Sequence, residues 1–174
     1  INLSKAADCN SFFVVSSIMK YIVYHFIKIM KLEGLYKLNV KKEIVWQALN
    51  DPDILKQCIP GCKSFEKESD TIFNATATNQ IGPMNAKFSG TVTLSNIQEN
   101  QSYTLSGEGQ SSVGFANGSA DVKIKEENGS TTLSYEVNVN VGGKVAQLGS
   151  RLIDGVAKKM SDYFFGRFSD LVSP

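Results

Sequence analysis

The chain has very little of the residue on which most nucleophilic active sites depend. It holds one histidine, His25, and residues 31–174 contain none. A serine or cysteine nucleophile needs a general base, which is usually histidine. The glycine-containing segments 107–109 and 118–120 are not followed by a strand–loop–helix pattern, so they predict neither a phosphate-binding loop nor a nucleophile elbow. The sequence therefore favours a protein that is not an enzyme.

Cysteine is also scarce, because the chain has only Cys9, Cys58 and Cys62. An odd number of cysteines without a dense framework predicts free thiols and a reducing compartment. Cys58 and Cys62 have a C-x3-C spacing, but a structural zinc site needs four ligands. We therefore expect no metal site and no metal cofactor, and we expect these two thiols to lie partly buried at a turn. A redox or metal-binding role is the alternative.

The charge of the chain is nearly balanced, with 18 Lys and Arg, 17 Asp and Glu, and a net charge of +1. The longest basic runs are the pairs Lys41-Lys42 and Lys158-Lys159, so no basic stripe is present. This pattern predicts no nucleic-acid partner. The length of 174 residues and the 42% hydrophobic content are typical of one globular domain.

One long apolar stretch, residues 12–32, stands apart from the rest of the chain. It approaches the ~20 residues of a membrane span, but Lys20 and Lys28 lie inside it, and a charge near the centre of a span costs about 2.5–3.5 kcal/mol. Residues 1–29 are therefore open to three interpretations: an apolar extension outside the domain, an amphipathic helix lying on a membrane, or a transmembrane span. We prefer the first, because Met30 directly precedes the first regular strand pattern.

The remaining residues predict one α+β domain over 30–169, followed by a short tail at 170–174. Alternating apolar residues predict a first strand at 32–40 and about six further strands within 64–142. Asn128-Gly129 predicts a tight type I′ hairpin between two of these strands. Helical spacing predicts two short helices between them, the second one capped by Asp51 or by Asp53.

A long helix is predicted from about residue 144 to 168, with a length of about 37 Å. Antiparallel strands with one apolar face need a cover, and this is the one long helix that the domain offers. The predicted fold is therefore a curved antiparallel sheet of about seven strands wrapped around the C-terminal helix.

The apolar faces of the predicted strands carry many small residues where a solid core would have larger ones. These residues are Gly34, Ala75, Ala77, Ala86, Gly90, Gly107, Gly109, Ala116, Gly118 and Ala120. They either let the sheet coil and the helix approach closely, or leave an apolar cavity for a ligand. The predicted cavity lining is Phe73, Ile81, Met84, Phe88, Tyr103, Leu105, Phe115, Leu148, Leu152, Val156, Met160 and Phe164. Tyr36, Tyr103 and Tyr135 either donate hydrogen bonds into that cavity or are ordinary core tyrosines.

Several segments of the chain resemble the G-subunit family of carbon monoxide dehydrogenase, a branch of the START-like, polyketide-cyclase superfamily. They are Ala48–Pro52 with Leu55, Cys58–Cys62, Ile81–Gly90, Tyr103–Gly109 and Gly142–Ile153. The resemblance spans residues 30–169 in order. It implies a helix-grip (START-like) fold with two short helices after the first strand, and an apolar cavity beneath the long helix.

The resemblance also implies a function. The expected role is a non-catalytic accessory protein of a molybdenum-containing carbon monoxide dehydrogenase or related hydroxylase, with a quinone or lipid bound in the cavity. The expected location is cytoplasmic, at the inner face of the cell membrane. One alternative is an interaction module that recruits the dehydrogenase to the membrane without a ligand. Another is a small cyclase or hydrolase of the same superfamily.

Overall fold

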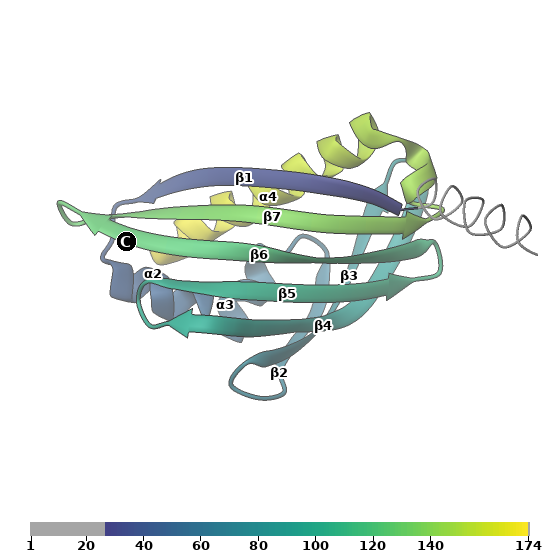
Figure 1. Cartoon of the computed structure of the whole chain (residues 1–174). Helices are drawn as coiled ribbons and strands as arrows, with labels where there is room; N and C mark the ends of the chain where they lie inside the picture. Colours follow the sequence, from purple (N-terminus) through teal and green to yellow (C-terminus); the bar gives the residue numbers. More distant parts are fainter. Residues whose placement is uncertain (1–26, 174) are drawn as a thin grey trace, which may run out of the picture.

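The computed structural model describes residues 27–173, which form one curved antiparallel sheet with a long helix against one of its faces (Figure 1). The strand order is β1-β7-β6-β5-β4-β3-β2. The elements are β1 (Ile27–Leu38), α2 (Lys42–Leu49), α3 (Pro52–Cys58), β2 (Cys62–Lys67), β3 (Ile72–Ile81), β4 (Met84–Gln98), β5 (Ser102–Ser111), β6 (Gly114–Glu127), β7 (Ser130–Gly143), the 3-10 turn η1 (Ala146–Leu148) and α4 (Ser150–Val172). The predicted fold class is confirmed.

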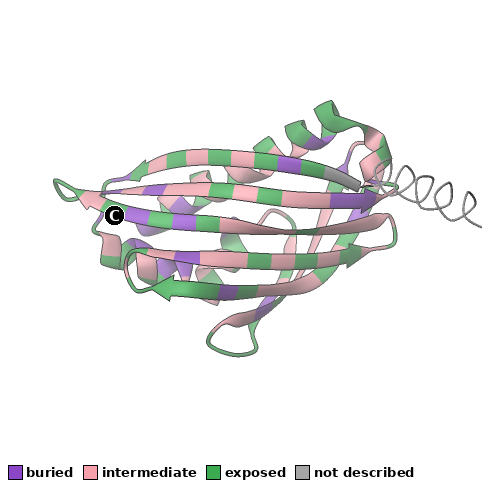
Figure 2. Cartoon of the chain, in the orientation of Figure 1, coloured by how far each residue is buried: buried purple, intermediate pink, exposed green. Residues whose placement is uncertain are grey.

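The strands alternate between an apolar inner face and a polar outer face, as the sequence pattern predicts. In β4, Ala86 and Leu94 are buried, whereas Lys87 and Ser95 are exposed. Figure 2 shows this alternation as bands along the strands. Because successive side chains of a strand point to opposite faces, only the inner set can reach α4.

The connections between the elements use the turn residues that the sequence analysis identified. The Asp51 side chain caps α3 by accepting hydrogen bonds from the backbone N–H groups of Asp53, at 2.9 Å, and Ile54, at 3.3 Å. Asn128 and Gly129 have φ angles of 52° and 77°, as a type I′ hairpin between β6 and β7 requires. These two predictions are confirmed.

The predicted long helix differs from the observed one at both ends. It begins at Ser150 because Gly149, with a φ of 81°, interrupts the helical backbone after the short η1 turn. It ends at Val172, four residues after Phe168, and both side chains are buried on the same face. Residues 170–172 are therefore part of the packed helix, and the prediction of a tail from residue 170 was wrong for them.

The first strand also begins earlier than the sequence pattern indicates. β1 starts at Ile27, which pairs with Gly142 of β7, so residues 27–29 belong to the sheet although they were assigned to the extension. Residues 1–26, on which the other interpretations of the apolar stretch depend, lie outside the described residues. No helix among residues 27–173 combines the length and apolar composition that crossing a membrane requires.

Candidate functional site

Two apolar cavities lie between the inner face of the sheet and the helices. The first, here called the aromatic cavity, has a volume of about 330 Å³ and is lined by residues of the sheet, α2, α3 and α4. The second, here called the glycine cavity, has a volume of about 370 Å³ and is lined by the sheet and the first half of α4. Val92 of β4 lines both cavities, so the two hollows adjoin each other.

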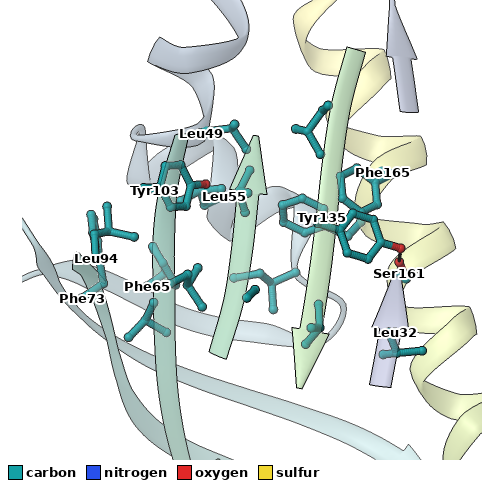
Figure 3. A pocket seen from close by; sticks show the side chains of 18 residues that line it. Leu32, Leu49, Leu55, Phe65, Phe73, Leu94, Tyr103, Tyr135, Ser161 and Phe165 are labelled. Atoms are coloured by element: carbon teal, nitrogen blue, oxygen red, sulfur yellow. Dashed lines mark hydrogen bonds between the residues drawn. The ribbon is translucent and has the colours of Figure 1, made fainter. Parts of the chain in front are cut away.

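The aromatic cavity is walled by rings that pack against each other. Phe65 of β2 and Phe73 of β3 stack with ring centroids 5.3 Å apart. Trp46 of α2 meets Tyr103 of β5 edge-on at 5.7 Å. Leu55 of α3 closes the same space from the helical side (Figure 3). Phe65, Phe73 and Tyr103 are thus held in the cavity wall by ring contacts, and Trp46 supports the wall from outside the lining.

A second aromatic group attaches α4 to the edge of the sheet beside this cavity. The ring of Phe165 lies 4.0 Å from that of Tyr36 and 5.0 Å from that of Tyr135. The hydroxyl groups of Tyr135 and Ser161 share a hydrogen bond of 2.7 Å, drawn dashed in Figure 3. A Cβ atom at Gly34 would overlap the ring of Tyr135, so glycine is needed there for this ring to cross β1 towards the helix.

The aromatic cavity contains no charged side chain. Its side-chain polar groups are three hydroxyls, those of Tyr103, Tyr135 and Ser161. Burial raises the pKa of Tyr103 above its ordinary value, so this phenol stays protonated at neutral pH. Such a surface suits a neutral, mainly apolar molecule, because an unpaired charge would lose its hydration there without compensation.

The glycine cavity is hollow for a different reason, since small residues of the central strands form its floor. A Cβ atom at Gly107 or Gly109 would meet no atom closer than 3.8 Å, so these two positions have room for a methyl group at ordinary van der Waals distances. A Cβ atom at Gly90 would instead overlap the backbone carbonyl of Glu108, and one at Gly118 would overlap that of Asn138. The small residues therefore play two parts: Gly107 and Gly109 border the cavity, whereas Gly90 and Gly118 allow close approach of neighbouring strands.

The glycine cavity continues into a surface cleft beside α4. Asn79, Val156 and Met160 line both the cavity and the cleft. Arg151 and Lys159 lie along the cleft together with Tyr163, which is 48% exposed. The cleft therefore adjoins the glycine cavity at these three shared residues.

The structure divides the predicted lining residues into distinct sets. Phe73, Tyr103, Leu105 and Phe164 line the aromatic cavity, and Ile81, Phe88, Val156 and Met160 line the glycine cavity. Leu152 lines the surface cleft.

Three predicted lining residues, Met84, Phe115 and Leu148, line neither cavity. Phe115 lies on the outer face of β6, where its ring covers Gly142, because it follows the strand alternation opposite to Ala116. Met84 and Leu148 pack against a small core cluster around Val145. These placements correct the prediction.

The predicted lining did not include the two short helices or the aromatic group on α4, although Tyr135 was a candidate hydrogen-bond donor. Leu49, Leu55 and Ile59 line the aromatic cavity, as do Tyr135 and Phe165. The spacing of apolar residues in each short helix predicts that Leu49 and Leu55 face inward. It does not predict which part of the sheet they face. For Tyr135, the alternation of apolar and polar residues along β7 places the ring on the inner face. This alternation was the signal from which its place in the cavity lining could have been predicted.

The two described cysteines do not lie at the cavity walls. Cys58 is fully buried at the end of α3, and burial raises the pKa of its thiol to about 11. Cys62 is partly buried at the start of β2, and its thiol donates a hydrogen bond to the carbonyl oxygen of Ser64 at 3.4 Å. Within residues 27–173, no three histidine, cysteine or acidic side chains come together as a metal site.

Comparison with known structures places the fold among START-like proteins. A conserved protein from Geobacillus kaustophilus is similar at 30% sequence identity and a TM-score of 0.78, with 82% of this chain and 95% of that chain covered. A START superfamily protein from Mycobacterium smegmatis is similar at 13% identity and a TM-score of 0.62, covering 82% and 96% of the two chains. The Zhui aromatase/cyclase from Streptomyces sp. R1128 is similar at 11% identity and a TM-score of 0.63, covering 83% and 94%. The last two likenesses show the fold alone.

Comparison with protein families gives a more specific result. The model of the family described as the G subunit of carbon monoxide dehydrogenase (CoxG) matches residues 34–173. This range contains α2, α3, α4 and all of the sheet except the first part of β1. No relative among functionally curated proteins matches the chain.

Proposed function

The chain belongs to the CoxG family of carbon monoxide dehydrogenase, and from this we propose that it is a non-catalytic accessory protein that binds an apolar molecule between its sheet and helix α4. The enzyme that it serves is a molybdenum-containing carbon monoxide dehydrogenase or a related hydroxylase. The bound molecule is a quinone or a lipid. The family supports the accessory role, and the cavities support the binding of a ligand.

One observation carries the proposal: the aromatic cavity is lined almost entirely by apolar side chains and has a volume of about 330 Å³. Natural ligand sites have volumes of about 300–1,000 Å³, with mainly apolar walls and a few polar groups. Packed cores rarely contain voids of this size, because a void forfeits the dispersion contacts of its lining. A ligand that fills the cavity would restore those contacts.

The composition of the cavity favours binding over catalysis. A superfamily cyclase or hydrolase needs a general acid or base that touches the substrate. The ionisable side chains that line the aromatic cavity are those of Tyr103 and Tyr135, and burial raises the pKa of Tyr103 further from neutral pH. A phenol that stays protonated donates a hydrogen bond but is a poor base.

The ligand part of the proposal is tested by native mass spectrometry of the full chain after gentle purification. We expect a mass above that of the polypeptide, released as a neutral apolar molecule on denaturation. A protein that carries no such mass, and that binds no quinone, lipid or fatty acid in a dye-displacement titration, would leave only the recruiting role without a ligand.

The partner part of the proposal is tested separately. We propose a cytoplasmic protein that contacts the inner face of the cell membrane, where quinones and lipids are available. Affinity purification of the tagged chain from its own cells should recover molybdenum hydroxylase subunits, and fractionation should find part of both proteins with membranes. Recovery of neither subunits nor membranes would contradict the accessory role even if a ligand were bound.

A further inference from the structure

The hydroxyl group of Tyr103 is buried without a hydrogen-bond partner. Tyr103 is 5% exposed, and no side chain or backbone group among residues 27–173 forms a hydrogen bond with its hydroxyl. The other cavity tyrosine differs, because Tyr135 has Ser161 as its partner at 2.7 Å. Buried polar groups in native proteins almost always have a partner, and an unpaired one costs free energy. The Tyr103 hydroxyl is therefore an exception that needs a physical explanation.

The position of this hydroxyl is set by the packing of its ring. Tyr103 pairs with Val122 across the sheet, and Trp46 of α2 holds the ring edge-on at 5.7 Å. Figure 3 shows the oxygen directed away from β5 into the space beside Leu49 and Leu55. The donor is thus fixed by the protein before any ligand arrives, which lowers the entropy cost of binding.

We propose that Tyr103 anchors the ligand by donating a hydrogen bond from its hydroxyl to a neutral acceptor oxygen, such as the carbonyl of a quinone or an ester. This assignment rests on the proposed ligand-binding function and names the chemical class of the ligand. A free carboxylate does not fit, because no cationic side chain lines the aromatic cavity to compensate a buried charge. A hydrocarbon without oxygen does not fit either, because the hydroxyl would stay unpaired.

The remainder of such a ligand has a place in the structure. The glycine cavity adjoins the aromatic cavity at Val92 and offers a second apolar space of about 370 Å³. A ring with a carbonyl oxygen would lie beside Tyr103, and an apolar chain would extend over Gly107 and Gly109 towards the cleft beside α4. The apolar chain of the ligand would then enter the protein at this cleft.

The test compares two probes with the same carbon skeleton. Dimethylnaphthoquinone carries two carbonyl oxygens, and dimethylnaphthalene carries none. Methylation of both carbons beside the carbonyls prevents thiol addition to the quinone. Competition against a neutral fluorescent dye measures their affinities for the full chain and for Tyr103→Phe. We expect Tyr103→Phe to weaken binding of the quinone about five- to tenfold and to leave the affinity for the hydrocarbon unchanged.

A matched control is Tyr36→Phe, which removes the hydroxyl of a tyrosine that lines neither cavity and should leave both affinities unchanged. Thermal unfolding without ligand gives a second readout. Tyr103→Phe removes an unsatisfied polar group at constant shape, so the unfolding temperature should rise by about 2–4 °C. A structural tyrosine would behave in the opposite way, since its loss would lower that temperature.

The outcomes separate the anchor from the proposed function. If neither probe binds the unaltered protein, both the proposed ligand site and the anchor are contradicted. If both probes bind the unaltered protein and Tyr103→Phe changes neither affinity, the ligand site stands and the anchor is wrong. A lower unfolding temperature for Tyr103→Phe would also overturn the anchor, because the hydroxyl would then have a partner in the unliganded protein.

Discussion

The aromatic cavity and the glycine cavity are similar in volume but hollow for different reasons. Large rings surround the first, and their positions are fixed by contacts such as those between Phe65 and Phe73. The second exists because Gly107 and Gly109 place no side chain under α4. The first also contains hydroxyl groups, whereas the second opens into a cleft with basic residues. The difference assigns the polar end of a ligand to the aromatic cavity and its apolar chain to the glycine cavity.

The largest expected effect comes from adding one methyl group to a glycine that permits close strand approach. In Gly90→Ala the new Cβ would overlap the carbonyl oxygen of Glu108, so the two strands must separate. We expect the free energy of unfolding to fall by about 1–3 kcal/mol, as measured by chemical denaturation. Gly107→Ala is the matched control on the neighbouring strand, where the new Cβ would make only ordinary van der Waals contacts, and it should change stability by less than about 1 kcal/mol. Equal losses in the two variants would refute the division of the glycines into two kinds.

The next effect concerns ligand binding and distinguishes the two cavities directly. Ala120→Phe places a ring in the aromatic cavity, and Ala77→Phe places the same ring in the glycine cavity. We expect Ala120→Phe to weaken dimethylnaphthoquinone binding at least tenfold, a loss of about 1.4 kcal/mol. Ala77→Phe should leave this short probe bound but weaken an analogue with a long alkyl chain. Loss of the short probe in Ala77→Phe, with Ala120→Phe unaffected, would reverse the assignment of ring and chain.

A smaller effect is expected where α4 is attached to the sheet. Ser161→Ala removes the partner of the Tyr135 hydroxyl, and the hydrogen bond of 2.7 Å is lost. We expect the free energy of unfolding to fall by about 1 kcal/mol, measured by denaturation. Ser169→Ala, farther along the same helix and partly buried as well, serves as the control. If both variants lose the same stability, the hydrogen bond does not hold the helix in place.

The smallest effect at neutral pH is that of Cys58, which is buried at the end of α3, and it grows only at alkaline pH. Burial raises the pKa of its thiol from 9.0 to about 11. The unfolded chain therefore releases this proton at lower pH than the folded chain, so the contribution to stability is complete below pH 9 and is lost as the pH rises towards 11. Denaturation between pH 8 and 11 should show a steeper fall for the unaltered protein than for Cys58→Ala. Parallel curves would show that the thiol does not titrate differently in the two states.

Local patterns predicted most of the fold because the elements are determined by short-range chemistry. The alternation in β4, the cap at Asp51 and the hairpin at Asn128 all act within a few residues, and each prediction is confirmed. The start of α4 was wrong because the apolar spacing continues through Leu148, while the backbone of Gly149 breaks the helix.

The candidate site was predicted less completely because it depends on contacts between distant segments. Tyr103 was recognised as an inner-face residue, but the missing partner of its hydroxyl is visible only when α2 and α3 are in place. The alternation of β6 puts Phe115 on the outer face, opposite to Ala116. Its inclusion in the predicted lining was therefore inconsistent with the alternation of its own strand. The contribution of Leu49 and Leu55 needed the packing of both short helices on the sheet.

The most direct test of the account is a crystal structure of the full chain with dimethylnaphthoquinone. We expect density for the quinone ring in the aromatic cavity, with one carbonyl oxygen within hydrogen-bond distance of the Tyr103 hydroxyl. The hydrogen bond between Tyr135 and Ser161 should remain. A cavity filled by rotated side chains, or a probe bound only on the outer surface, would contradict it.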